Sequence, residues 1–107
     1  MQVNSTFLVE LQAYYPDAKD FVDGGMLYVH FPSLTLPNDT VVEALLLLTG
    51  SAPYTTRLFL SAQVPGKGSN WSQHVILTKT WWTWSWKDVP SDIRYVEMLA
   101  NHMSALR

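Results

Sequence analysis

The segment from Val41 to Leu48 is the feature that most restricts how this chain can fold. It reads VVEALLLL, and Glu43 alone interrupts its apolar residues. A strand that is covered on both faces has such a pattern, although a buried helix can have the same pattern. The flanking residues Thr40 and Gly50 favour the strand. We therefore expect a buried strand in this segment.

Three more strands are predicted around it. Asp23, Gly24 and Gly25 supply the positive-φ positions of a tight turn, which indicates a hairpin. The core-facing residues of its second strand are expected to be Leu27, Val29 and Phe31. A strand after the apolar segment should direct one face inward, formed by Leu58, Leu60, Ala62 and Val64. Because short turns link these four strands, we expect an antiparallel meander.

Apolar residues at helical spacing predict one helix near each end of the chain. The first follows Asn4 or Ser5 as its N-cap and ends before Pro16. The second is expected to follow Ser91 as its N-cap, with an apolar stripe formed by Ile93, Val96, Leu99, Ala100, Met103 and Leu106. The chain is thus predicted to be one α+β domain over residues 1–107, with helices packed against one face of the sheet.

All five tryptophans lie between Trp71 and Trp86, four of them in the stretch TKTWWTWSWKD. The segment 71–87 has no clean period and is expected to be a long irregular region, which in so small a domain is usually functional. Two or three rings should pack beneath it as anchors. The remaining rings could form a contact surface, so the residues predicted to bind a partner are Trp71, His74, Trp82, Trp84 and Trp86.

Composition excludes several classes of function. The net charge of −2 argues against a protein that binds nucleic acid electrostatically, which needs a basic face. The longest apolar run is too short to span a bilayer and the N-terminus shows no signal-peptide pattern, so we expect a cytoplasmic protein without a membrane partner. The histidines lack metal-ligand spacing, and neither a metal nor a cofactor is predicted. His30 and His102, the latter on the polar side of the last helix, are expected to be partly exposed.

Nucleophilic catalysis has only weak candidates in this sequence. There is no cysteine and no G-x-S-x-G stretch, and the GKGS stretch lacks the frame of a phosphate-binding loop. Ser72 and Ser85 lie in the segment that also contains His74. A serine hydroxyl needs an adjacent base to act as a nucleophile, and His74 is the base available in that segment.

The order of the predicted elements resembles the ubiquitin-conjugating-enzyme (UBC) fold, and in particular the bacterial UBC-like proteins of prokaryotic family E. The stretches that carry the resemblance are GGMLYVHFP, LTLPNDT, ALLLLTGSAPY and TWWTWSWKDVPSDIRYVEMLANHM. It extends from about Leu11 to Leu106. The resemblance implies a role with a ubiquitin-like protein and its activating enzyme as partners. Operons of this bacterial type are typical of protein modification or antiphage defence.

The sequence departs from the family pattern at the catalytic position. Without a cysteine no thioester can form, and the segment before the last helix has no His-Pro-Asn spelling. The expected function is therefore that of a pseudoenzyme, an adaptor that binds the ubiquitin-like protein or its activating enzyme. Two alternatives stay open. One is an active conjugating enzyme with a non-cysteine nucleophile, or with its cysteine mutated away. The other is a tryptophan-lined module that binds carbohydrate or peptide.

Overall fold

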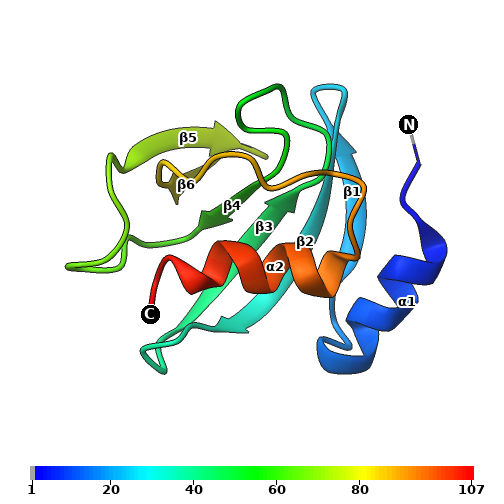
Figure 1. The fold of residues 1–107 in the computed structure, drawn as a ribbon, viewed down its shortest axis with the longest axis horizontal. Helices are drawn as coiled ribbons and strands as arrows, with labels where there is room; N and C mark the ends of the chain where they lie inside the picture. The colour runs from blue at the N-terminus through cyan, green and yellow to red at the C-terminus, as the bar shows by residue number, and fades with distance from the viewer. Residues whose placement is uncertain (1) are drawn as a thin grey trace.

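The computed structural model describes residues 2–107 and has an α+β fold with two helices and one antiparallel sheet (Figure 1). The helices are α1 (Ser5–Tyr14) and α2 (Tyr95–Ser104). The strands are β1 (Lys19–Asp23), β2 (Met26–Thr35), β3 (Val41–Leu47), β4 (Arg57–Leu60), β5 (Ser72–Ile76) and β6 (Lys79–Thr83). Their order across the sheet is β1-β2-β3-β4-β6-β5.

The first four strands form the predicted antiparallel meander. Asp23 pairs with Met26 across the β1–β2 turn, where Gly24 and Gly25 have φ values of 58° and 77°. These are the positive values that a two-residue hairpin turn requires and that glycine adopts without steric cost. The prediction of a hairpin at this position is confirmed.

The apolar run is the strand β3, which lies between β2 and β4. Successive side chains of a strand point to opposite faces of the sheet. Ala44 and Leu46 accordingly join a core cluster on one face, whereas Leu45 and Leu47 join a second cluster on the other. Because both faces are covered, the strand has no polar side. This confirms the strand and rules out the buried helix.

One face of the sheet is covered by the two helices, which contact each other; in Figure 1 α2 crosses in front of β2 and β3, and α1 lies to its right. We call it the helix face. Leu11 from α1 and Met98 and Leu99 from α2 are fully buried in its cluster, together with the predicted core residues Leu27, Val29, Phe31, Leu58, Leu60 and Val64. Ala62, also predicted to point inward, is exposed because β4 ends at Leu60.

The opposite face is covered by the hairpin β5–β6, and we call it the hairpin face. Its buried cluster consists of Tyr28, Leu45, Leu47, Phe59, Ile76 and Trp81. β6 pairs with β4 only where Leu60 faces Trp82. The hairpin then reaches back across the sheet, since Lys79, at the start of β6, forms an ion pair with Glu43 of β3.

This hairpin corrects two predictions: the sheet has six strands and not four, and residues 72–83 are not irregular. The turn of the hairpin is formed by Leu77 and Thr78, with φ values of 55° and 60°. Glycine, asparagine and aspartate are the residues that normally mark such a turn. The sequence therefore carries no turn signal at the position where the chain reverses.

The start of the last helix also differs from the prediction. Arg94, not Ser91, occupies the N-cap of α2 and provides no side-chain capping bond. Its guanidinium instead donates to Glu10 of α1, with Nε–Oε1 and Nη2–Oε2 distances of 2.8 and 2.5 Å, and to Glu97 at 3.1 Å. The helix begins at Tyr95, and the side chain of its N-cap residue ties α2 to α1.

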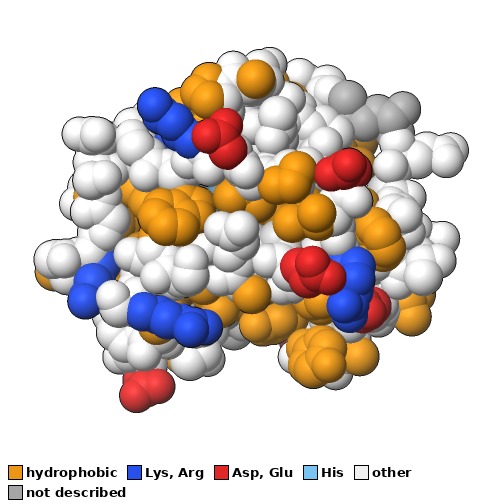
Figure 2. Space-filling model, viewed as in Figure 1, with side chains coloured by type: hydrophobic (Ala, Val, Ile, Leu, Met, Phe, Trp, Pro, Cys, Tyr) orange, Lys and Arg blue, Asp and Glu red, His pale blue; other side chains and the backbone are white. Residues whose placement is uncertain are grey.

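Acidic and basic side chains are interspersed on the face shown in Figure 2 and do not gather into a field of one sign. Nucleic-acid binding by charge requires such a field. Among residues 2–107, no helix is long and apolar enough to cross a membrane.

Candidate functional site

The hairpin face carries a hollow of about 410 Å³ between β5 and the ends of β2, β3 and β4. One end is polar and is lined by Ser51, Tyr54, Arg57 and His74. The other end is apolar and is lined by Met26, Tyr28, Leu47, Phe59 and Ile76. We call it the Arg57 pocket. Clefts of roughly 300–1,000 Å³ with few polar groups in an apolar lining are typical of ligand sites.

Arg57 lies at the polar end without a carboxylate partner among the described residues. Its guanidinium carbon stacks 4.2 Å from the centre of the Tyr54 ring, and Nη2 donates to the carbonyl of Trp84 at 3.3 Å. The Nε atom is buried and has no hydrogen-bond partner. Burial lowers the pKa of Arg57, but a guanidinium keeps its proton in proteins. The pocket therefore contains one positive charge that no side chain of residues 2–107 neutralises.

His74 on β5 lies beside this charge. Its ring packs edge-to-face on Phe59 with 5.3 Å between centroids, and Nε2 is 3.1 Å from the hydroxyl of Ser72. Burial, and secondarily the charge of Arg57, lower the pKa of His74 below its usual value. Its imidazole is consequently neutral at pH 7 and can accept a proton.

The two serine candidates lie in different surroundings. Ser72 contacts His74, as a nucleophile and its base must. Ser85 instead accepts a hydrogen bond from the hydroxyl of Tyr54 at 3.5 Å. Within the described chain, no acidic side chain orients His74, so the third group of a catalytic triad is missing from this pair.

The tryptophans divide into two buried rings and three partly buried ones. Trp81 and Trp84 are only 1% and 2% exposed, one in each core cluster. Trp71, Trp82 and Trp86 are partly exposed. Trp71 packs at 5.1 Å against Trp84, and Trp86 Nε1 donates to Asn101 of α2 at 2.9 Å. Trp84 was predicted to contact a partner, but its ring is buried in the cluster of the helix face.

Two histidines lie outside this pocket. His102, predicted on the polar side of α2, is instead 1% exposed, with Nε2 2.9 Å from the hydroxyl of Thr56. Burial, and secondarily the charge of Arg57, lower the pKa of His102 to about 4. His30 is partly exposed as expected and lies 2.7 Å from Glu43, which also pairs with Lys79. Those three side chains flank a second hollow of about 420 Å³ on the hairpin face.

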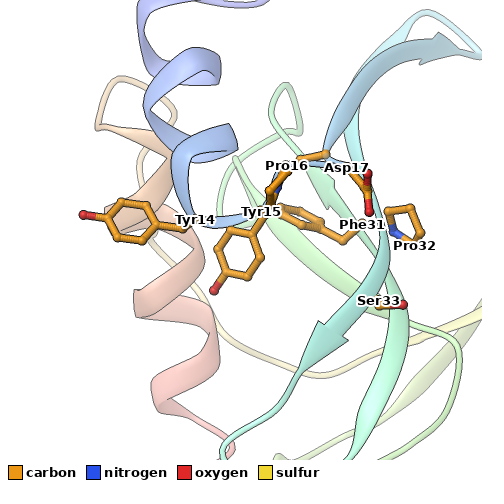
Figure 3. Close-up of a pocket in the computed structure, with 8 residues that line it drawn as sticks. Tyr14, Tyr15, Pro16, Asp17, Phe31, Pro32 and Ser33 are labelled. Carbon is orange, nitrogen blue, oxygen red and sulfur yellow. The ribbon is translucent and has the colours of Figure 1, made fainter.

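A third hollow, of about 110 Å³, lies where α1 meets β2 (Figure 3). The Tyr15 ring meets Phe31 edge-on, with centroids 5.4 Å apart, and Tyr14 points away from the hollow. Asp17 is the only ionisable side chain here besides the tyrosines. This hollow brings no catalytic or charged groups together.

Sequence reasoning missed Arg57 and Tyr54, which form the polar end of the main pocket. One signal was present, since Arg57 precedes the apolar residues of a short buried strand. In residues 2–107 no three metal-ligating side chains converge. Comparisons with protein-family models, curated proteins and solved structures found no match to this chain.

Proposed function

We propose that this chain is a non-catalytic protein-binding domain of the UBC-like type, which binds a ubiquitin-like protein or its activating enzyme in a bacterial conjugation system. The order of α1, the β1–β4 meander and α2 supports the UBC-like assignment. The hairpin β5–β6 occupies the position of the active-site segment in that resemblance. The absence of cysteine supports binding without thioester chemistry.

The observation that carries the binding role is the apolar outer surface of the hairpin. Val75 and Leu77 are 73% and 49% exposed. Trp82 is partly exposed and faces Gln73 across the hairpin, so it shares a face with Val75 two residues further along β5. We call these three residues the hairpin surface. A partly exposed tryptophan beside exposed apolar side chains is typical of protein interfaces, where such residues contribute much of the binding energy.

Binding can be tested with the ubiquitin-like protein and activating enzyme from the same operon. We expect a complex by size-exclusion chromatography and calorimetry. Val75→Asp should weaken it, because a charge is placed in the apolar interface. Val9→Asp is the matched control, since Val9 is 66% exposed but lies on α1. If the folded protein binds neither partner, the proposal fails. If the two variants weaken binding equally, the interface does not lie on the hairpin.

The contact between Ser72 and His74 favours a second candidate, an enzyme that forms an oxyester. His74 would take the proton of the Ser72 hydroxyl as its oxygen attacks the thioester on the activating enzyme. The acyl group would move to Ser72 and the thiolate would leave. Incubation with activating enzyme, ATP and the ubiquitin-like protein should then add the partner's mass to the 12.2 kDa chain, and Ser72→Ala should abolish the adduct. An unchanged mass while the activating enzyme is charged would exclude this reaction.

A further inference from the structure

We propose that the Arg57 pocket binds the C-terminal carboxylate of an extended peptide. The starting point is the guanidinium of Arg57, which lies in a hollow on the hairpin face and forms no ion pair with a carboxylate of the described residues. Partly buried charges are normally paired, because removing them from water is costly. A ligand carboxylate would supply the missing charge. The proposal does not depend on the UBC resemblance.

The charge in the pocket matches a carboxylate better than a phosphate. His74 adds no positive charge at pH 7, because burial and the nearby Arg57 keep its imidazole neutral. One guanidinium therefore faces the ligand, enough for a single negative charge but not for the nearly two charges of a phosphate monoester. The planar fork of arginine also fits the two oxygens of a carboxylate. Stacking on Tyr54 at 4.2 Å holds this fork in place before a ligand arrives.

The surroundings of the charge favour a peptide terminus over a free acid. The volume of about 410 Å³ is more than a carboxylate alone needs, and the apolar end formed by Leu47, Phe59 and Ile76 can accept an adjoining aliphatic side chain. The strand β5 lines the same hollow and is the last strand of the sheet in the described chain. An edge strand offers unpaired backbone groups to which an extended peptide can add. A free acid could not use these groups.

The pocket and the hairpin surface adjoin at Val75, which is 73% exposed and also lines the pocket. Leu77, 49% exposed in the turn of the hairpin, does not line this pocket. Substitutions at Leu77 and at the polar end of the pocket can therefore be distinguished. Leu77→Asp tests the proposed interface with a partner protein, and changes at the polar end of the pocket test the carboxylate site.

The test is a titration of the isotope-labelled protein, followed by backbone amide NMR signals. The probe is an acetylated tripeptide of alanine, valine and leucine with a free C-terminal carboxylate. We expect saturable shifts at Gly50, Arg57 and His74, and at least about tenfold weaker binding of the same peptide as its C-terminal amide. Equal affinities of acid and amide would overturn the proposal. If octanoate binds as tightly as the peptide acid, the pocket is a site for free carboxylic acids. If inorganic phosphate binds more tightly than the peptide acid, the pocket is a phosphate site. Either result overturns the proposal.

Two variants link the signal to the pocket. Arg57→Gln removes the charge and should abolish saturable binding, with the amide spectrum of the free variant as the check of its fold. Because Arg57 is partly buried, Ser51→Asp is the second variant. Ser51 is exposed at the pocket rim, so this change places a competing carboxylate beside the guanidinium at little risk to folding. It should weaken the peptide about tenfold. Ser33→Asp, exposed in the hollow at α1, is the control. Unchanged binding in Ser51→Asp would refute the site.

Discussion

The two faces of the sheet are built from the same strands but differ in what covers them. The helix face is closed by α1 and α2 over a large aliphatic cluster, and its one buried histidine is bonded to Thr56. The hairpin face has a small cluster under β5–β6, half of it aromatic, and the two larger hollows lie beside it. The two-stranded hairpin leaves gaps of about 410 and 420 Å³ over its face of the sheet, whereas the hollow beside the helices, where α1 meets β2, measures about 110 Å³. We infer that the helix face mainly provides stability and that the hairpin face provides the surfaces that can bind.

Truncating one buried tryptophan on each face gives the largest expected effect. Trp84→Ala should lower the free energy of unfolding by about 3–5 kcal/mol, because a large cavity opens beneath the helices. Trp81→Ala should cost a comparable amount, and it should also speed hydrogen exchange in β5–β6 far more than in α2. Chemical denaturation and native-state hydrogen exchange measure the two effects. If Trp81→Ala accelerates exchange equally on both faces, the faces are one cooperative unit.

Acid should destabilise the helix face through His102. Its pKa is about 4 in the folded state and near 6.5 when unfolded, so the unfolded state binds the proton more readily. The associated stability is complete above pH 6.5 and is lost as the pH falls towards 4, by roughly 3 kcal/mol.

Denaturation at a series of pH values tests this expectation by difference. In His102→Gln, the decrease in the free energy of unfolding between pH 6.5 and 4 should largely disappear. In His74→Gln this decrease should change less, because His74 is only partly buried on the hairpin face. Carboxylates contribute equally to all three proteins and cancel in the comparison. A profile of His102→Gln that parallels the unmodified protein would argue against a neutral buried His102.

The N-cap of α1 tests whether a local change on the helix face stays local. The side chain of Asn4 accepts a hydrogen bond from the backbone N–H of Phe7 at 3.0 Å. Asn4→Ala should cost about 1 kcal/mol, since that donor loses its protein partner. Exchange should accelerate in α1 while β5–β6 keeps its protection. Asn4→Ser should restore most of the stability, and failure of this rescue would indicate that the cap contributes little.

The smallest effect is expected at the ion pair that ties the hairpin to β3. Lys79→Gln removes one of the two partners of Glu43 and leaves His30, and exposed pairs of this kind contribute less than about 1 kcal/mol. The loss should shrink further at high salt because the charges are screened. Lys67→Gln is the control, as Lys67 forms no ion pair among the described residues. A salt-independent loss would mean that packing, and not charge, holds the hairpin.

Prediction from sequence worked where a pattern is local. The Gly24-Gly25 turn and the alternation of Leu27, Val29 and Phe31 are set by backbone sterics and by the pleat of a strand, which few residues specify. It failed at β5–β6, because Leu77 and Thr78 adopt positive φ without a glycine. It also misplaced His102, whose burial depends on packing against Thr56 of the loop before β4.

The candidate site could be predicted only in part. The sequence pointed to the tryptophan segment and to His74, and the structure places His74 in the main pocket. Arg57 and Tyr54 are remote from that segment in the chain and reach it only because β6 pairs with β4. A contact of this kind depends on which strand the hairpin joins, and no local pattern encodes that choice.

The sequence by itself determined that the chain can bury a core and that no cysteine chemistry is possible, and it favoured a buried strand from Val41 to Leu48. These properties follow from residue types and their spacing. Only the tertiary structure decided which tryptophans are anchors, that His102 is buried, and that Arg57 has no partner charge among residues 2–107. Burial and charge pairing arise from contacts between distant segments, and they exist only once the helices and the hairpin have closed over opposite faces of the sheet.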